Sequence, residues 1–166
     1  MMRPMTVMTQ QSYYILEEDK ALAKERIEQI EREILEMGPA FHEALNQTSE
    51  TWHDNAPFDA LREKQAVLAA ELQTLKENLS KSSPVLPKPQ NGRVNIGSRV
   101  KLSHDTKKSN HHYFLAGHWT FRLGESVNDH MIISCQSPLG ASLLGKGLGD
   151  SVTLPNKQQL TVAGIE

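Results

Sequence analysis

Two carboxylates in one short polar segment are the side chains of this 166-residue sequence best suited to chemistry. Glu50 and Asp54 lie in the stretch TSETWHDNAPF, between two longer segments with a helical pattern. Carboxylate oxygens suit a hard cation such as Mg²⁺, which can also coordinate the phosphates of a substrate. Alternatively, Asp54 caps a helix and Glu50 is solvated, and the two residues by themselves favour this simpler interpretation.

A second chemical motif lies near the C-terminus. Residues 140–146, GASLLGK, match most of a phosphate-binding loop. Gly147 stands where that motif needs Ser or Thr to bind Mg²⁺, and no alternating strand–helix pattern surrounds it. These glycines are therefore predicted to form tight turns with positive φ rather than to bind a nucleotide.

The histidines and the single cysteine are further potential ligands. Five of the seven histidines lie in the second half, at spacings that match no helical pair or zinc finger: His104, His111, His112, His118 and His130. Surface or strand positions explain them better than a metal site. Cys135 lies in the apolar run MIISCQ and is predicted to be a buried structural thiol. A lone cysteine excludes an intrachain disulfide and a cysteine-based zinc site.

The elements that position the acidic segment are two predicted helices with heptad seams. Before the segment, apolar residues recur at steps of three and four, and the pattern extends back to Ala23 and Leu16: Ile27, Ile30, Ile34, Met37, Phe41 and Ala44. After it, a second seam follows the same spacing: Leu61, Gln65, Leu68, Leu72, Leu75 and Leu79. Because the connection is short, residues 12–82 are predicted to form an antiparallel coiled-coil hairpin.

Local signals refine this hairpin. Pro57 suits the first turn of the second helix, with Asp54 or Asn55 as its cap. Gly38-Pro39 should kink or interrupt the first helix. A heptad pattern specifies a partner helix and not a function, so a structural or dimerising coiled coil remains an alternative interpretation.

A change of period marks a second domain. Residues 83–92 are rich in Pro and Gly and are predicted to be a linker. Residues 93–166 contain short alternating runs separated by turn residues, namely VNIGSRVKL, HYFLAG, MIISCQ, DSVTLP and QLTVAGI. One helical turn fits LGASLLG. The prediction is an α+β chain with a small, mostly antiparallel β domain at its C-terminus.

Composition and charge exclude several classes of protein. Hydrophobic residues make up 38% and charged residues 23% of the chain, as in folded proteins. Residues 1–83 carry 9 basic and 15 acidic side chains, whereas residues 84–166 carry 9 basic and 5 acidic ones. Neither half is basic enough for DNA binding by bulk electrostatics. No apolar run reaches the roughly 18 residues of a membrane span, so we expect a soluble, cytoplasmic protein without membrane contact.

Two segments resemble the bacterial Gre transcription elongation factors of the GreA/GreB type. The stretch QSPLGASLLGKGLGDSVTLP resembles their C-terminal signature, and DNAPFDALREKQAVLAAEL resembles a Glu-Asn-Ala-Glu-Tyr segment that is followed by Ala-Arg-Glu and Gln. In the second stretch the matching residues are Asn55, Ala56, Arg62, Glu63 and Gln65. The order of a coiled-coil hairpin, a linker and a small β domain is also similar to that family.

The resemblance implies a fold and a function. The C-terminal domain would be FKBP-like and would dock on the RNA polymerase core at the rim of its secondary channel. The partner-binding residues implied by the signature are Ser137, Pro138, Leu139, Leu144, Gly145, Lys146 and Asp150. The hairpin would reach down the channel as a monomer, with Trp52, Asn55 and Phe58 at its tip and Arg62 facing nascent RNA. Acidic tip residues would help hold the second Mg²⁺ with which the polymerase itself cleaves backtracked RNA.

The tip departs from the family pattern, which reads Gly-Asp-x-x-Glu-Asn. Asp54 takes the second acidic position, but Thr51 stands at the first and Glu50 lies one residue earlier. Two outcomes are open: Asp54 and Glu50 support cleavage, or the altered tip occupies the channel without efficient cleavage. Prolyl isomerase activity of the β domain would rest on fold analogy alone, and an aromatic content of 5% supplies few residues for such a pocket.

Overall fold

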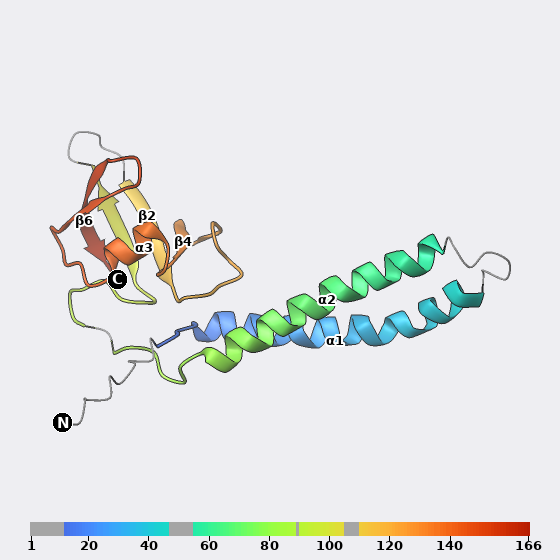
Figure 1. Cartoon of the computed structure of the whole chain (residues 1–166). Coiled ribbons are helices and arrows are strands. Elements are labelled where there is room, and N and C mark those ends of the chain that lie inside the picture. The colour runs from blue at the N-terminus through green and yellow to red at the C-terminus, as the bar shows by residue number, and fades with distance from the viewer. Residues whose placement is uncertain (1–11, 47–54, 89, 105–109) are drawn as a thin grey trace, which may run out of the picture. The chain divides into compact units, whose positions relative to one another are not determined.

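A computed structural model describes residues 12–46, 55–88, 90–104 and 110–166 of the chain. Its contacts divide the chain into a helical unit, residues 17–81, and a C-terminal unit, residues 82–166 together with residues 12–16. Figure 1 shows two long helices in the first unit and a sheet with one short helix in the second. This arrangement confirms the predicted α+β class.

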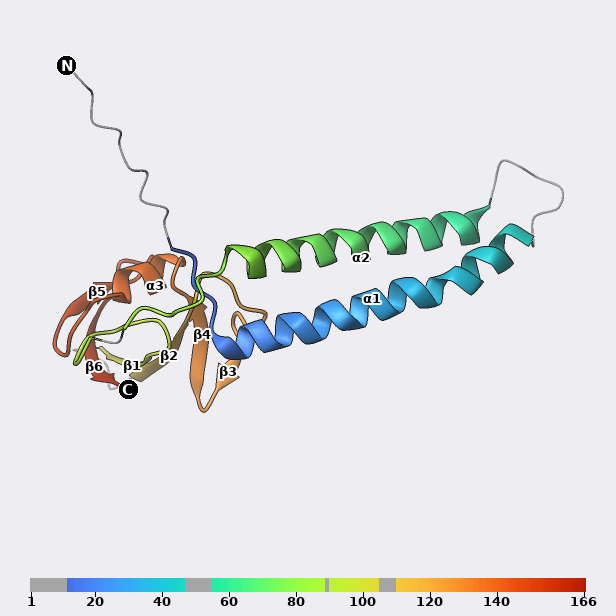
Figure 2. The ribbon, with the colours of Figure 1, turned by 90° about the horizontal axis from the view of Figure 1, so that it is seen from below.

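The helical unit is an antiparallel pair, α1 (Glu17–Asn46) and α2 (Ala56–Lys81), which lie side by side in Figures 1 and 2. The buried apolar residues of α1 fall seven apart, as a heptad seam requires: Ala23, Ile30, Met37 and Ala44. On α2 the buried residues Leu68 and Leu75 are also seven apart. Neither helix, in the part of the chain that the structure describes, is long and apolar enough to cross a membrane.

Two predicted seam positions are wrong. Gln65 is exposed, because its amide remains in water while the leucines of the next turns carry the packing. Leu16 precedes α1 and packs against Ala116 and Ile132 in the C-terminal unit. Leu16 lies seven residues before Ala23, but this heptad spacing does not place it in the seam.

Helix α1 continues through Pro39, so the predicted interruption does not occur. Proline has no N–H to donate to the carbonyl of Leu35. Leu35 lies on the solvent side of the helix, with 78% of its surface exposed, so water can satisfy that carbonyl. Met37 and Ala44, on either side of the proline, are both buried, and this packing holds the helix together.

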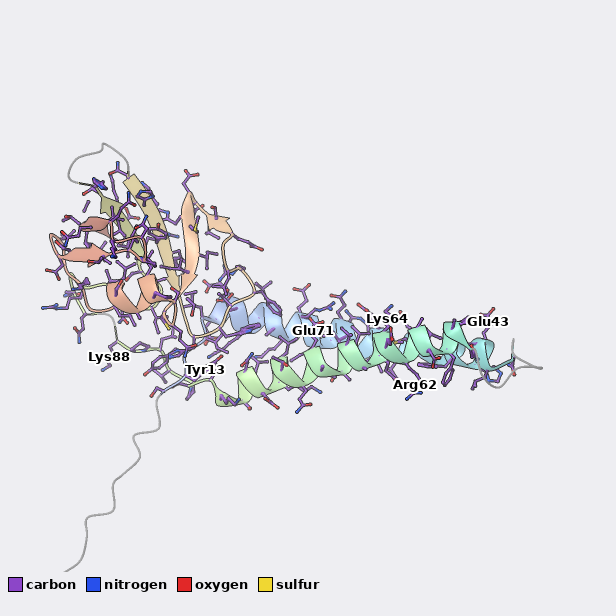
Figure 3. All side chains as sticks on the ribbon, turned by 45° about the horizontal axis from the view of Figure 1, so that its top comes forward. Tyr13, Glu43, Arg62, Lys64, Glu71 and Lys88 are labelled. Carbon is purple, nitrogen blue, oxygen red and sulfur yellow. The ribbon has the colours of Figure 1, made fainter. Side chains whose placement is uncertain are left out.

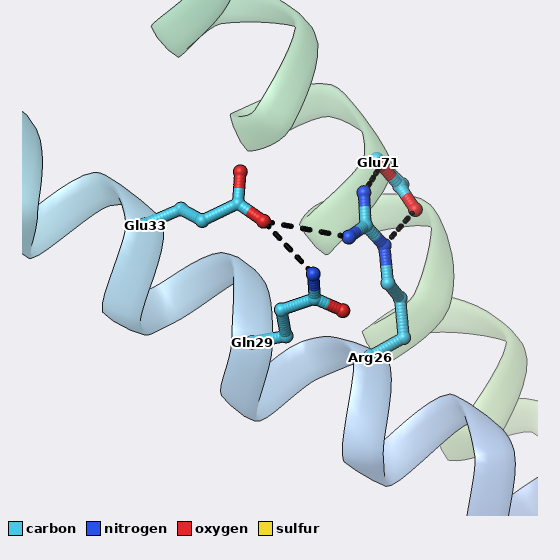
Figure 4. A network of polar contacts seen from close by, with 4 residues as sticks. All are labelled: Arg26, Gln29, Glu33 and Glu71. Carbon is cyan, nitrogen blue, oxygen red and sulfur yellow. Dashed lines mark hydrogen bonds and ion pairs between the residues drawn. The ribbon is translucent and has the colours of Figure 1, made fainter.

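A polar network joins the two helices beside the seam (Figure 4). Arg26 donates from Nε to Glu71 Oε1 at 2.7 Å and from Nη2 to Glu71 Oε2 at 2.8 Å. Glu33 lies 3.6 Å from Arg26 Nη1 and accepts a hydrogen bond from Gln29 at 3.1 Å. The hydrogen bond from Arg26 lowers the pKa of Glu71, and the same bond raises the pKa of Arg26. The fork of two parallel bonds fixes which turns of α1 and α2 face each other.

The C-terminal unit contains one six-stranded sheet in the order β3-β4-β2-β1-β6-β5. Its strands are β1 (Arg99–Ser103), β2 (Asn110–Ala116), β3 (Ser126–Val127), β4 (His130–Ser134), β5 (Ser151–Thr153) and β6 (Gln159–Ile165), and α3 (Pro138–Leu143) follows β4. All pairs are antiparallel except β2 and β4, which are parallel. That pair arises because the chain reverses at β3 before it enters β4.

The larger core cluster of the C-terminal unit lies on one face of the sheet, where α3 contributes Leu143, and a smaller cluster around Ala116 and Ile132 lies on the other. The strands supply alternate residues to the larger cluster, as a half-buried sheet requires. Its buried members are Val94, Val100, Leu102, Leu115, Cys135, Leu143, Val152, Leu160 and Val162.

Residues 12–16 belong to the C-terminal unit, whereas the sequence assigned them to the hairpin. Tyr14 N–H donates to His118 Nδ1 at 2.9 Å, and His118 N–H donates to the carbonyl of Tyr14 at 2.7 Å. A Cβ at Gly117 would collide with that carbonyl, so only glycine permits this close approach. Ile15 and Leu16 are buried as a result.

We expect Ile30→Asp to unfold the helical unit, because a charge would be forced into the seam at a cost of several kcal/mol. Leu35→Asp on the exposed face of the same helix should change stability by less than about 0.5 kcal/mol. Circular dichroism and denaturant unfolding measure both effects. Equal loss of helix in the two variants, or in neither, would contradict the assigned seam.

Candidate functional site

The loop end of the hairpin is closed by one amide side chain. Asn55 precedes α2, and its Oδ1 accepts a hydrogen bond from Phe58 N–H at 3.1 Å, as an N-cap does. Its Nδ2 donates to the carbonyl of Ala44 at 3.0 Å. That carbonyl is among the last four of α1, which have no partner within the helix. Asn55 therefore provides a hydrogen-bond partner for an N–H group at the start of α2 and for a carbonyl group at the end of α1.

An aromatic pair lies one turn from this amide. The rings of Phe41 and Phe58 meet edge to face, with centroids 5.5 Å apart at 74°. Such pairs add about 0.5–1.5 kcal/mol beyond the area that they bury. Asn55 and Phe58, both predicted as tip residues, therefore hold the base of the loop. The capping role predicted for Asp54 or Asn55 belongs to Asn55.

The predicted metal ligands Glu50 and Asp54 lie outside the described residues, as do Thr51 and Trp52. Their role remains a prediction from the sequence. Within residues 12–46, 55–88, 90–104 and 110–166, no three or more His, Cys, Asp and Glu side chains cluster as metal ligands would.

The basic residues of the helices fall into two groups. Arg62 and Lys64 are exposed on α2 toward its loop end (Figure 3). Arg26 and Lys20, by contrast, are paired with Glu71 and Glu17. The RNA-facing role predicted for Arg62 therefore fits its exposure.

The C-terminal signature begins with a capped helix. Ser137 Oγ accepts a hydrogen bond from Gly140 N–H at 3.0 Å and donates to the carbonyl of Ser134 at 2.7 Å. Pro138 follows in the first turn, where its missing N–H costs nothing. A Cβ at Gly140 would collide with the Ser134 carbonyl, so this glycine lets α3 lie directly on the end of β4.

After α3 the signature makes tight turns. Gly145 has a φ of 76°, which confirms the predicted turn at that position, and Gly149 beyond it has a φ of 84°. The prediction of positive φ is wrong for Gly140, which lies within α3, and for Gly147. Arg93 donates to the Gly145 carbonyl at 2.8 Å, and Val94 N–H donates to the Lys146 carbonyl at 2.8 Å. Asp150 Oδ2 accepts from Gly147 N–H, also at 2.8 Å.

The predicted partner-binding residues thus divide into a supporting and an exposed set. Ser137 and Asp150 make the bonds above, and Leu139 packs against the core. Pro138, Leu144 and Gly145 are exposed. Leu148 is also exposed, over 64% of its surface, and the sequence analysis missed it. The sequence does contain a sign of this exposure, because Leu148 lies between two glycines and belongs to no alternating or heptad pattern of apolar residues.

A cavity of about 680 Å³ lies within the C-terminal unit beside this segment. Its lining includes Tyr14, Ile96, His118, Cys135, Gln136 and Leu144. Burial raises the pKa of the Cys135 thiol, so less of it is present as the nucleophilic thiolate. The prediction of a buried, structural cysteine is confirmed.

Residues 89–166 match the sequence model of the family described as "Transcription elongation factor, GreA/GreB, C-term". The chain is 36% identical over 103 residues to the transcription elongation factor GreA of Chlorobium phaeovibrioides, which covers 61% of this chain and 62% of the relative. Residues 89–166 are therefore similar to the C-terminal domain of the GreA/GreB family. The matched residues 89–166 contain the whole sheet, α3 and the turns that follow it.

One relative is similar over most of the chain. The GreA of Mesomycoplasma hyopneumoniae is 26% identical over 161 residues, covering 92% of this chain and 96% of the relative. Among solved structures, the GreA factor homolog 1 (Gfh1) protein of Thermus thermophilus is 21% identical, with a TM-score of 0.41 over 94% of this chain and 99% of that chain. The chain spans about three fifths of the length of the first curated relatives that it matches.

We expect Asn55→Ala to destabilise the helical unit by about 2 kcal/mol, because it removes an N-cap and a bond to α1 worth about 1 kcal/mol each. Asn55→Ser keeps a capping oxygen but cannot reach Ala44, so it should cost about half as much. Denaturant unfolding gives the energies, and amide exchange at Phe58 reports the cap. If serine costs as much as alanine, the cap contributes nothing.

Proposed function

We propose that this chain is a transcription elongation factor that binds the core of bacterial RNA polymerase. The C-terminal unit docks at the rim of the secondary channel, and the hairpin enters the channel. The observation that carries this proposal is the family match over residues 89–166, in which the signature forms a capped helix and fixed turns. The exposed side chains Pro138, Leu144 and Leu148 supply the docking contacts.

The helical unit is long and thin enough to enter the secondary channel. Helix α1 has 30 residues, so it is about 45 Å long at 1.5 Å per residue. Its apolar seam packs against α2, and a pair of helices is thin enough to enter a narrow channel. Arg62, exposed near the loop end, contacts the nascent RNA of a backtracked complex. The factor acts as a monomer in the cytoplasm.

At the tip, Asp54 and Glu50 present carboxylates to a Mg²⁺ ion shared with the polymerase active site. The donor set fits such an ion, because Mg²⁺ prefers oxygen ligands and keeps positions open for phosphate. Thr51 is neutral where the family has its first acid, so the ion is held less well. We therefore expect the factor to occupy arrested complexes and to stimulate transcript cleavage weakly. The polymerase performs the hydrolysis, and the factor is not itself an enzyme.

For docking, we expect Leu144→Glu to weaken binding to core polymerase by at least about tenfold, because a charge would replace an exposed apolar contact. Leu123→Glu, which alters a leucine that is 58% exposed in the same unit but outside the signature, is the matched control. Co-purification and a titration with core enzyme measure the effect. Equal affinity of both variants would exclude the signature as the docking site and favour a coiled-coil module for another partner.

For cleavage, we expect the native chain to stimulate RNA cleavage in stalled complexes weakly. Thr51→Asp should raise the rate on the order of tenfold, which is about 1.4 kcal/mol of activation free energy. Asp54→Asn should abolish the remaining stimulation. Glu43→Gln removes an acid from α1 near the loop end (Figure 3) and should change nothing. Robust cleavage that survives Asp54→Asn at fixed Mg²⁺ would overturn the ligand role of the tip.

A further inference from the structure

Two histidines that are far apart in the sequence meet on one face of the sheet. His112 is on β2 and His130 begins β4, and their ring centroids are 5.1 Å apart at an angle of 85°. The parallel register pairs Tyr113 with Met131, so the preceding residues on each strand are also neighbours. The sequence spacing of 18 residues gave no sign of this pair, because it depends on the parallel contact of β2 with β4.

The backbone holds this pair in place. Side chains alternate along a strand, so His112 shares its face with Phe114 and Ala116. Ala116 and Ile132 are buried in a cluster that also contains Leu16, and Phe114 packs against it. The two histidines therefore lie at the solvent-facing end of the strands, next to the buried side chains of the same face. His112 and His130 are both partly exposed, so solvent reaches both rings.

A backbone carbonyl fixes the proton of one ring. His130 Nδ1 lies 2.7 Å from the carbonyl oxygen of Asn128. A carbonyl oxygen can only accept, so Nδ1 carries the hydrogen and Nε2 of the neutral ring keeps its lone pair. Histidines that ligate metals commonly donate their other N–H to a backbone carbonyl in this way. Asn128 and Asp129 both have positive φ, 48° and 61°, in the tight turn that aims this carbonyl back at the ring.

The neighbouring charge indicates which cations fit. Lys101 on β1 is paired in register with His112, so a positive side chain stands beside the pair. Because this side chain is positive, electrostatic attraction cannot hold a cation here. The cation must be held by coordinate bonds to the imidazole nitrogens. Imidazole nitrogen suits Zn²⁺, Ni²⁺ and Cu²⁺, whereas Mg²⁺ and Ca²⁺ require oxygen ligands.

We propose that His112 and His130 form a two-histidine binding site for a divalent transition-metal ion, with water in the remaining positions. The ion joins β2 to β4 at the exposed end of their parallel pair. This site lies in the C-terminal unit and is independent of the acidic tip and of its Mg²⁺. It also does not depend on the proposed binding to polymerase.

The test uses the full chain with Zn²⁺ alone as the probe. Imidazole resonances in two-dimensional NMR should identify His112 and His130 as the rings that respond first, and calorimetry gives the affinity. His112→Ala and His130→Ala should each weaken Zn²⁺ binding at this site by at least about tenfold. Zn²⁺ should also raise the melting temperature of the native chain, because it binds the folded sheet and not the unfolded strands.

His111→Ala is the matched control, because His111 is an exposed histidine on the same strand whose side chain points to the opposite face. It should leave Zn²⁺ affinity unchanged, and Mg²⁺ should leave both resonances unshifted. The proposal is overturned if His111→Ala weakens binding as much as His112→Ala. It is also overturned if neither His112→Ala nor His130→Ala changes the affinity, or if Zn²⁺ up to about 1 mM shifts neither ring.

Discussion

The helical unit depends on a single apolar seam, because a pair of helices has one interface and no second layer. The seam positions on α1 are small or flexible at three of four heptads, with Ala23 and Ala44 near the two ends and Ile30 and Met37 between them. Alanine lets the helix axes approach, and the larger isoleucine fills the space between the helices. Substantial apolar side chains off the seam, such as Leu35 and Val67, are exposed. In another register, the buried seam residues would become exposed. Few other apolar side chains would become buried in their place.

Polar contacts make this register specific. The forked pair of Arg26 and Glu71 can form at one alignment of the helices, and its partners are about one third exposed. Exposed ion pairs contribute about 0–1 kcal/mol, so this pair selects an alignment more than it stabilises the unit. Asn55 acts in the same direction at the loop end, through bonds to both helices. At the other end, Ser83 N–H donates to the carbonyl of Tyr13 at 2.6 Å, which joins the residues that flank the hairpin.

The sequence predicts whatever depends on local period or local turn chemistry. The heptads of both helices and the turn at Gly145 follow from spacing and residue type, and the structure has them. Contacts between distant segments were not accessible in this way. The two-residue strand β3 is too short for a period, so the parallel contact of β2 with β4 that it makes possible could not be foreseen. Leu16 had the right phase for the seam, and only the close approach of Tyr14 to Gly117 assigns it to the sheet. The acidic tip was identified by residue type alone.

The signature segment is held in place by bonds and close approaches of its own residues. Ser137, Gly140 and Asp150 each make a bond or a close approach that a different side chain would break, so they preserve the path on which Leu144 and Leu148 are exposed. The exposure of those leucines is thus a consequence of the scaffold beneath them. The seam, by contrast, ends at Ala44 and the pair of Phe41 with Phe58, before the acidic segment is reached. In the sequence, Thr51 is not one of the apolar heptad positions. The proposed docking residues and the proposed metal ligands therefore lie in separate segments of the chain, and a substitution in one segment removes no bond of the other.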